Sequence, residues 1–318
     1  MSDDASWLSI PLSEVAMGES IGGGGVAIVY RGTFRRQPVA LKTLFDPRVD
    51  TALQQEFMDE LLVMSKLHHP NVVTLIGACV EPPRLCMVME LCEHSLHHLL
   101  HATNSALGVE QLTKIASCKH KHTTTNRLNA SLQEDVACGM RYLHAQSPAC
   151  HQEPDSIYSI RDLKSANVLL DASGRAKLCD FGLVRTKVTS AGTPSYMPPE
   201  LLSGRPFSKA VDVYMFGVLL WEIYSRDVPF RGYDVNDIRL KVLTGERPRI
   251  PTIDCPTECQ RDDMQQLIKS CWDADPNRRP TFEQVHVSLR AVVIPQDLSF
   301  AAANVSGGDA LDDLLSGR

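Results

Sequence analysis

The segment YSIRDLKSANVLLD, residues Tyr158 to Asp171, places an acid, a base and an amide within six residues of one another. These side chains belong to Asp162, Lys164 and Asn167, and the apolar run VLL that follows them is typical of a buried strand. Asp162 could accept a proton from a hydroxyl nucleophile. Taken singly, each of these polar residues is more simply explained as a loop side chain that caps a turn.

A second short apolar run, AKLCDFG, spans residues 176–182 and ends on Asp180, Phe181 and Gly182. Oxygen ligands such as those of Asp180 and Asn167 suit Mg²⁺, which proteins usually hold through few groups of their own together with phosphates. Taken singly, Asp180 too is more simply explained as a loop carboxylate that caps a turn.

The first third of the chain alternates short β-rich runs with turn residues. Residues 26–34 and 38–44 are separated by a polar turn, which predicts a hairpin. Apolar residues then recur at helical spacing between Leu53 and Met64, and His69-Pro70 ends the helical pattern. Two further apolar runs follow before residue 93. This part predicts a small sheet with one main helix.

Beyond residue 93 the pattern becomes helical, and residues 210–225 are apolar almost all round, as in a helix buried inside a larger body. We therefore predict an α+β fold of two lobes, a small β-rich lobe and a larger helical one, with the active site in the cleft between them. The last residues are small, polar and acidic, and are predicted to form a flexible tail.

Glycines at positions 22 to 25 precede a predicted strand, where missing side chains let backbone N–H groups approach phosphate oxygens. Four consecutive glycines are equally compatible with a flexible loop. Lys42 lies on the next strand inside an apolar run, and Glu60 on the following helix could pair with it. Considered alone, the two are more simply unrelated surface charges.

In chain order the sequence carries a glycine-rich turn, A-x-K, a helical Glu, R-D-L-K-x-x-N, D-F-G and P-P-E. This ordered set resembles the protein kinase family, over roughly Met17 to Val292. The segments LHHPNVVTLIGAC and CWDADPNRRPTF are similar to the corresponding sequences of the tyrosine-kinase-like group, which includes the mixed-lineage and Raf-like kinases. The resemblance implies a bilobal protein kinase fold with an N-terminal extension at 1–16, a kinase domain at 17–292 and a tail at 293–318. Within that domain it implies a small lobe at 17–90, a hinge at 90–93 and a large lobe at 94–292.

The resemblance also implies a role for each matching residue. Lys42, positioned by Glu60, would hold the ATP phosphates; Asp162 would be the catalytic base, with Lys164 near the γ-phosphate; and Asn167 and Asp180 would bind Mg²⁺. Met89 would be the gatekeeper at the start of the hinge. Glu200 would pair with Arg279, and Asp212 would brace the catalytic loop. The implied ATP site comprises Ile21, Gly22, Gly23, Gly24, Gly25, Val29, Ala40, Lys42, Met89, Glu90, Cys92, Leu169 and Asp180.

Lys164 two residues after Asp162, with the segment GTPSYMPPE, resembles the serine/threonine kinases. The implied function is transfer of the γ-phosphate of ATP to Ser and Thr hydroxyls of protein substrates in intracellular signalling. Thr186, Thr189 and Ser190 are candidate phosphosites, open to an upstream activating kinase, where a phosphate could pair with Arg161 or Arg185.

The sequence departs from the family at two kinds of position. Ala27 replaces the third loop glycine, and Ile160 replaces the histidine of H-R-D. Residues 118–134 and 150–159 resemble insertions, the first polar and without an apolar stripe. If 118–134 is removed, Leu112, Ile115, Val136, Met140 and Leu143 fall on one helical face.

These departures leave three alternatives open. The two segments could be translated intron sequence or real additions. The protein could be a pseudokinase, a nucleotide-binding scaffold with weak or no transfer activity. Cys118, His120 and His122 could hold zinc, although a fourth ligand is not evident.

Composition and charge argue against several classes of protein. The 318 residues carry a formal net charge of −6, which gives no electrostatic reason to expect nucleic acid as a partner. No apolar run approaches the length of a membrane span, and the acidic start does not resemble a secretory signal. The 10 cysteines are too dilute for a disulfide scaffold. These features predict a cytoplasmic protein.

Overall fold

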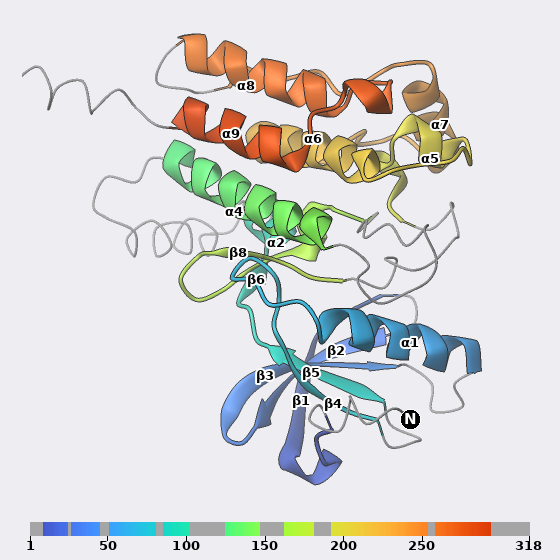
Figure 1. Cartoon of the computed structure of the whole chain (residues 1–318), viewed down its shortest axis with the longest axis vertical. Helices are drawn as coiled ribbons and strands as arrows, with labels where there is room; N and C mark the ends of the chain where they lie inside the picture. The colour runs from blue at the N-terminus through green and yellow to red at the C-terminus, as the bar shows by residue number, and fades with distance from the viewer. Residues whose placement is uncertain are drawn as a thin grey trace, which may run out of the picture.

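The predicted hairpin forms strands β2 (Ala27–Phe34) and β3 (Gln37–Leu44), which pair antiparallel. Arg35 and Arg36 turn the chain with φ values of 49° and 65°, the left-handed backbone that two-residue hairpin loops require. This computed structural model describes residues 9–24, 27–44, 51–80, 85–101, 125–146, 162–180, 192–253 and 258–293 (Figure 1).

The hairpin belongs to a five-stranded antiparallel sheet in the order β1-β2-β3-β5-β4, completed by β1 (Val15–Gly24), β4 (Leu75–Cys79) and β5 (Cys86–Glu90). Helix α1 (Thr51–Met64) packs on it through Phe57, Leu61 and Met64, at the predicted helical spacing. The α1 helix and this sheet form the smaller lobe at one end of the molecule (Figure 1).

The larger lobe is helical. Its central helix, α6 (Ala210–Ser225), is buried along almost its whole length, as its apolar sequence predicts. Figure 1 shows α4 (Thr125–Ala145), α8 (Glu258–Cys271) and α9 (Phe282–Val293) stacked with it. Among the described residues, the other helices are α2 (Leu96–His101), α5 (Pro199–Leu202) and α7 (Val235–Leu243), with short 3₁₀ turns η2 (Leu12–Glu14), η3 (Ser165–Asn167), η4 (Pro194–Tyr196) and η5 (Pro276–Arg278).

A three-stranded sheet, β6-β7-β8, lies where the two lobes meet (Figure 1). It consists of β6 (His94–Ser95), β7 (Val168–Leu170) and β8 (Ala176–Leu178). Its last two strands are the apolar runs that follow Asn167 and precede Asp180, so the sheet brings the ends of both polar segments together.

Residues 125–134, part of the predicted insertion at 118–134, contribute to the core although no apolar stripe was expected there. The insertion itself stays a prediction. Residues 125–134 form the first half of one continuous helix, α4, and Leu132 and Gln133 are fully buried. Leu132, Val136 and Met140 recur every four residues, so Leu132 extends the buried face toward the N-terminus. Leu112 and Ile115, which were expected on that face, lie outside the described residues.

The small lobe also includes residues before position 17. The Ile10 side chain is buried in a cluster with Val39, Leu41 and Val88, and its backbone N–H donates to the Ala78 carbonyl over 2.9 Å. Strand β1 begins at Val15. Residues 9–16 are therefore part of the packed lobe, whereas the sequence pattern placed them in an extension.

Candidate active site

A cavity of about 950 Å³ lies between the two lobes. Its walls come from β1, β2, β3 and α1 of the small lobe and from η3, β7 and the residues after β8 of the large lobe. The predicted nucleotide-binding residues that line it are Ile21, Gly22, Gly23, Val29, Ala40, Lys42, Met89, Glu90, Cys92, Leu169 and Asp180. Gly24 ends β1 in register with Ala27, and Gly25 lies outside the described residues.

Lys42 and Glu60 form an ion pair, as the sequence predicts. The Lys42 Nζ lies 2.6 Å and 2.8 Å from the two carboxylate oxygens of Glu60, and 3.6 Å from Asp180 Oδ1. Burial opposes the charge on Lys42, but the two carboxylates outweigh it and raise its pKa. The pairing keeps a cation fixed on β3, inside the cavity.

Asp162 is the centre of a second cluster. Its Oδ2 accepts hydrogen bonds from Lys164 Nζ at 2.7 Å and from Asn167 Nδ2 at 3.1 Å. Asn167 also donates to the Asp162 backbone carbonyl over 2.9 Å, which closes the turn between the two residues. The three polar residues of the opening segment therefore converge on one carboxylate, at the edge of the same cavity.

Thr193 completes this cluster and was missed from the sequence. Its hydroxyl donates to Asp162 Oδ1 over 3.1 Å and accepts from Lys164 Nζ over 2.8 Å. The available signal was the G-T-P triplet that leads into P-P-E. Thr193 lies 31 residues after Asp162, and only the tertiary fold shows that their side chains meet.

Asp180 is held in an unusual backbone conformation. Its φ is 65°, in the left-handed region that residues other than glycine rarely adopt. The preceding Cys179 donates its backbone N–H to the Asn167 carbonyl over 3.0 Å, which fixes the segment beside η3. Such strain persists where surrounding contacts impose it, often at functional sites. Burial raises the pKa of the Cys179 thiol, which stays protonated.

The residues at the base of the cavity fit a magnesium ion. Among the described residues, no group of three or more His, Cys, Asp or Glu side chains is placed to hold a metal. Mg²⁺ needs fewer protein ligands when phosphate oxygens supply the rest. The Asn167 amide nitrogen donates to Asp162, which leaves the side-chain oxygen of Asn167 as an acceptor. Asn167 and the half-exposed Asp180 both line the cavity and offer the hard oxygen donors that Mg²⁺ prefers.

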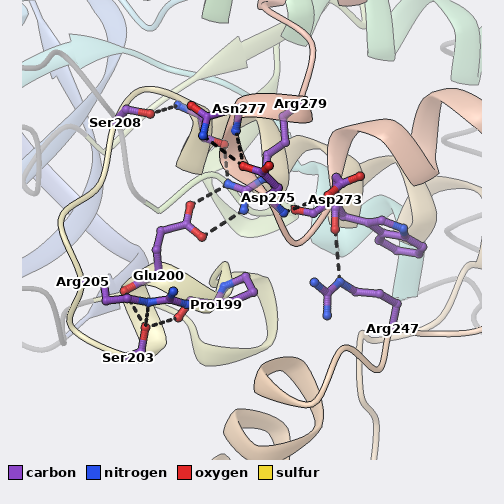
Figure 2. A network of polar contacts seen from close by, with 12 residues as sticks. Pro199, Glu200, Ser203, Arg205, Ser208, Arg247, Asp273, Asp275, Asn277 and Arg279 are labelled. Atoms are coloured by element: carbon purple, nitrogen blue, oxygen red, sulfur yellow. Dashed lines mark hydrogen bonds and ion pairs between the residues drawn. The ribbon is translucent and has the colours of Figure 1, made fainter.

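A buried ion pair and a buried hydrogen bond join segments of the large lobe. Arg279 donates to both oxygens of Glu200, at 2.6 Å and 2.9 Å, as the sequence predicts (Figure 2). The Arg279 side chain is completely buried and also donates to the Ala210 carbonyl over 3.0 Å. Asp212 accepts from His144 Nε2 at 2.8 Å. The ion pair joins α5 to the segment before α9, and the hydrogen bond joins α6 to α4.

Several predicted residues lie outside the described part of the chain. These are the catalytic-loop positions Ile160 and Arg161, the DFG residues Phe181 and Gly182, Arg185, the three candidate phosphosites Thr186, Thr189 and Ser190, the zinc candidates Cys118, His120 and His122, and the segment 150–159.

Comparison with known proteins agrees with this geometry. Residues 15–289 match the family model described as protein tyrosine and serine/threonine kinase. A probable serine/threonine-protein kinase of Dictyostelium discoideum is 34% identical over 287 residues, covering 87% of this chain and 28% of the relative. The dual specificity protein kinase shkC of the same organism is 34% identical over 298 residues, covering 90% of this chain and 53% of the relative.

A plant protein shows a similar likeness. The probable serine/threonine-protein kinase SIS8 of Arabidopsis thaliana is 34% identical over 304 residues, covering 92% of this chain and 26% of the relative. The chain thus spans at most about half of the length of these relatives. The family model covers most of the chain, and the two lobes, their sheet and the cavity between them have the architecture of the family. The chain belongs to the protein tyrosine and serine/threonine kinase family.

Proposed function

We propose that this protein is an ATP-dependent protein serine/threonine kinase. The observation that carries the proposal is the convergence of two clusters on one cavity, the Lys42–Glu60 pair with Asp180 and the Asp162–Lys164–Thr193 triangle. The first cluster suits the phosphates of a nucleotide. The second presents a carboxylate and a cation where a hydroxyl would approach the terminal phosphate.

The chemistry follows from these positions. The hydroxyl oxygen of the substrate attacks the γ-phosphorus, its proton passes to Asp162, the bond to the β-phosphate breaks and ADP leaves. Lys164 neutralises charge on the transferred group, and Lys42 holds the α- and β-phosphates. Asn167 and Asp180 would hold Mg²⁺, which neutralises phosphate charge when bound. The protein contributes positioning and electrostatic stabilisation and forms no covalent bond itself.

Thr193 supports hydroxyl substrates of the Ser/Thr type. Its hydroxyl lies between Lys164 and Asp162. The three side chains therefore limit the space through which a substrate hydroxyl can reach Asp162, the candidate base. Some relatives are named dual specificity kinases, which makes tyrosine a substrate to be tested rather than assumed absent. The intact Lys42, Glu60 and Asp162 geometry favours transfer over the alternative of a pseudokinase.

The proposed setting is cytoplasmic signalling, with protein substrates and an upstream kinase acting on Thr186, Thr189 or Ser190. Cys86, Cys92, Cys138, Cys179 and Cys271 form no disulfide, as a reducing compartment favours. Within the described residues, none of the helices has the length and apolar character that crossing a membrane requires.

The test is phosphate transfer from radiolabelled Mg·ATP to peptides carrying Ser, Thr or Tyr as the single acceptor. Asp162→Asn should lower kcat by at least about 100-fold, since general-base catalysis contributes about 10²–10⁴-fold. Asp262→Asn, an exposed carboxylate on α8, is the matched control and should leave kcat unchanged. Equal labelling by wild type and Asp162→Asn would refute the assigned base. Chelation of Mg²⁺ should abolish transfer.

A further inference from the structure

A buried carboxylate outside the cavity, that of Glu222 on α6, accepts hydrogen bonds from three segments. Ser165 Oγ donates to its Oε1 over 2.7 Å, and His101 Nε2 lies 2.8 Å from the same oxygen. The Tyr196 hydroxyl donates to Oε2. Glu222 is 1% exposed, so these donors replace the water that the carboxylate lost on folding.

Two of these donors belong to segments that carry the reaction centre. Ser165 directly follows Lys164 and opens η3, which ends at Asn167. Tyr196 ends η4, and its backbone N–H donates to the Thr193 carbonyl over 2.9 Å. Lys164 and Thr193 are the residues whose side chains close the triangle with Asp162. Each of the two segments is therefore fixed to one oxygen of the same carboxylate.

The third donor comes from α2. Because a carboxylate only accepts, the His101 imidazole must carry a proton on Nε2. Its side chain is 13% exposed. His94, Ser95 and His98, one to two turns earlier on this segment, line the cavity. His101 thus joins the helix at the mouth of the cavity to the carboxylate beneath the catalytic loop.

We propose that Glu222 is a positioning residue for phosphoryl transfer, and that His101 holds it in place. The proposal rests on the proposed function. Glu222 touches neither nucleotide nor substrate; it sets the distance between the segment of Lys164 and the segment of Thr193, so that both side chains meet at Asp162. Burial, followed by the charge of Glu222, raises the pKa of Tyr196, which keeps its hydroxyl protonated and donating.

The geometry separates this role from a purely structural one. Small displacements of reacting groups slow transfer steeply, while most of the predicted nucleotide contacts come from the small lobe and the hinge, away from Glu222. Loss of the Glu222 contacts should therefore lower kcat and leave the KM for ATP unchanged. A residue that only stabilised the fold would lower the melting temperature and leave kcat per folded molecule intact.

The experiment compares steady-state kinetics, nucleotide affinity and melting temperature for matched variants of the full chain. Tyr196→Phe and Ser165→Ala each remove one hydroxyl that donates to Glu222. His101→Leu removes the third donor, and His101→Gln restores an N–H donor of similar reach. His68→Gln, at an exposed position after α1, is the control and should behave as wild type.

We expect kcat to fall about tenfold in Tyr196→Phe, Ser165→Ala and His101→Leu, which corresponds to about 1.4 kcal/mol in the barrier. His101→Gln should recover most of the loss. Wild-type kcat in folded Tyr196→Phe and Ser165→Ala, or an unchanged kcat in folded His101→Leu, would overturn the proposal. If His101→Leu fails to fold, the hydroxyl variants decide the matter. A wild-type protein that neither binds nucleotide nor transfers phosphate would instead refute the proposed function. The nucleotide-affinity measurement therefore tells a failure of the proposed function from a failure of the role proposed for Glu222.

Discussion

At the scale of single residues, the site depends on polar, mostly partly buried side chains that pair with one another. Lys42 lies between Glu60 and Asp180, and Asp162 accepts from three donors in the described structure. A buried charge without its partner is unfavourable, so these groups hold one another in place. Thr193 is the least expected member, because an ordinary threonine hydroxyl bridges the acid and the cation.

We predict that Thr193→Ala lowers kcat with a serine peptide by about 10-fold to 100-fold, or about 1.4 to 2.7 kcal/mol in the barrier. The reason is that Asp162 Oδ1 and Lys164 Nζ both lose a partner. Thr193→Ser keeps the hydroxyl and should retain most of the activity. Initial-rate kinetics at saturating ATP measure the effect. Thr252→Ala, at an exposed position, is the control; a Thr193→Ala enzyme as active as this control would contradict the prediction.

At the scale of elements, α4 shows how a segment can be polar in composition and still occupy the core. Residues 125–134 contain few apolar side chains, yet Leu132 is fully buried and Gln133 donates to the Tyr224 hydroxyl over 2.9 Å. Arg226 donates to Asn129 over 2.8 Å. Hydrogen bonds to α6 and the residue that caps it thus replace part of the apolar packing. Within the described residues, the Gln133 carbonyl oxygen is buried without a hydrogen-bond partner.

The helix can be tested through its buried leucine. Leu132→Ala should lower the free energy of unfolding by about 2–5 kcal/mol, because it removes apolar contacts and leaves a cavity. Leu62→Ala, on α1 at 40% exposure, is the chemically matched control and should lose much less. Denaturant unfolding followed by circular dichroism gives both values. A near-neutral Leu132→Ala would show that residues 125–134 do not fill this position in the core.

At the scale of the whole molecule, the cavity is built from both lobes, so a ligand in it joins them. The small lobe contributes Lys42 and the glycine-rich strand end, and the large lobe contributes Asp162, Leu169 and Asp180. Lys177 of β8 also donates to Glu90 over 2.9 Å, and Glu90 accepts from the Thr74 backbone N–H over 2.7 Å. These contacts hold the two lobes together at the hinge end of the cleft. At the opposite, open end, a bound ligand would supply the contacts between the lobes.

Nucleotide should therefore stabilise the molecule as one body. A non-hydrolysable ATP analogue with Mg²⁺, at 100 times its Kd, should raise the free energy of unfolding by about 2.7 kcal/mol. For a domain of this size that corresponds to a rise in Tm of about 4–5 °C. Thermal denaturation measures it, and Lys42→Met, which removes a phosphate contact, should shift less at the same concentration. No rise at any concentration would refute a nucleotide site.

The sequence by itself determined the two-lobed fold and most of the candidate site. Strand alternation and helical spacing are local patterns, and motifs such as R-D-L-K-x-x-N keep their polar residues close along the chain. The pairing of Lys42 with Glu60 and of Glu200 with Arg279 also followed from motif order, and the distances agree with it. The roles assigned to these residues stay predictions until activity is measured.

The tertiary structure decided what depends on contacts between distant segments. The contacts of Thr193 with Asp162, and of Glu222 with three segments, join positions 26 to 121 residues apart, which no local pattern relates. The burial of Leu132 in α4 was decided in the same way, because a polar segment becomes core when its few apolar side chains and its amides find partners on a neighbouring helix. Periodicity shows which face of an element is apolar, but only packing shows which polar groups are satisfied.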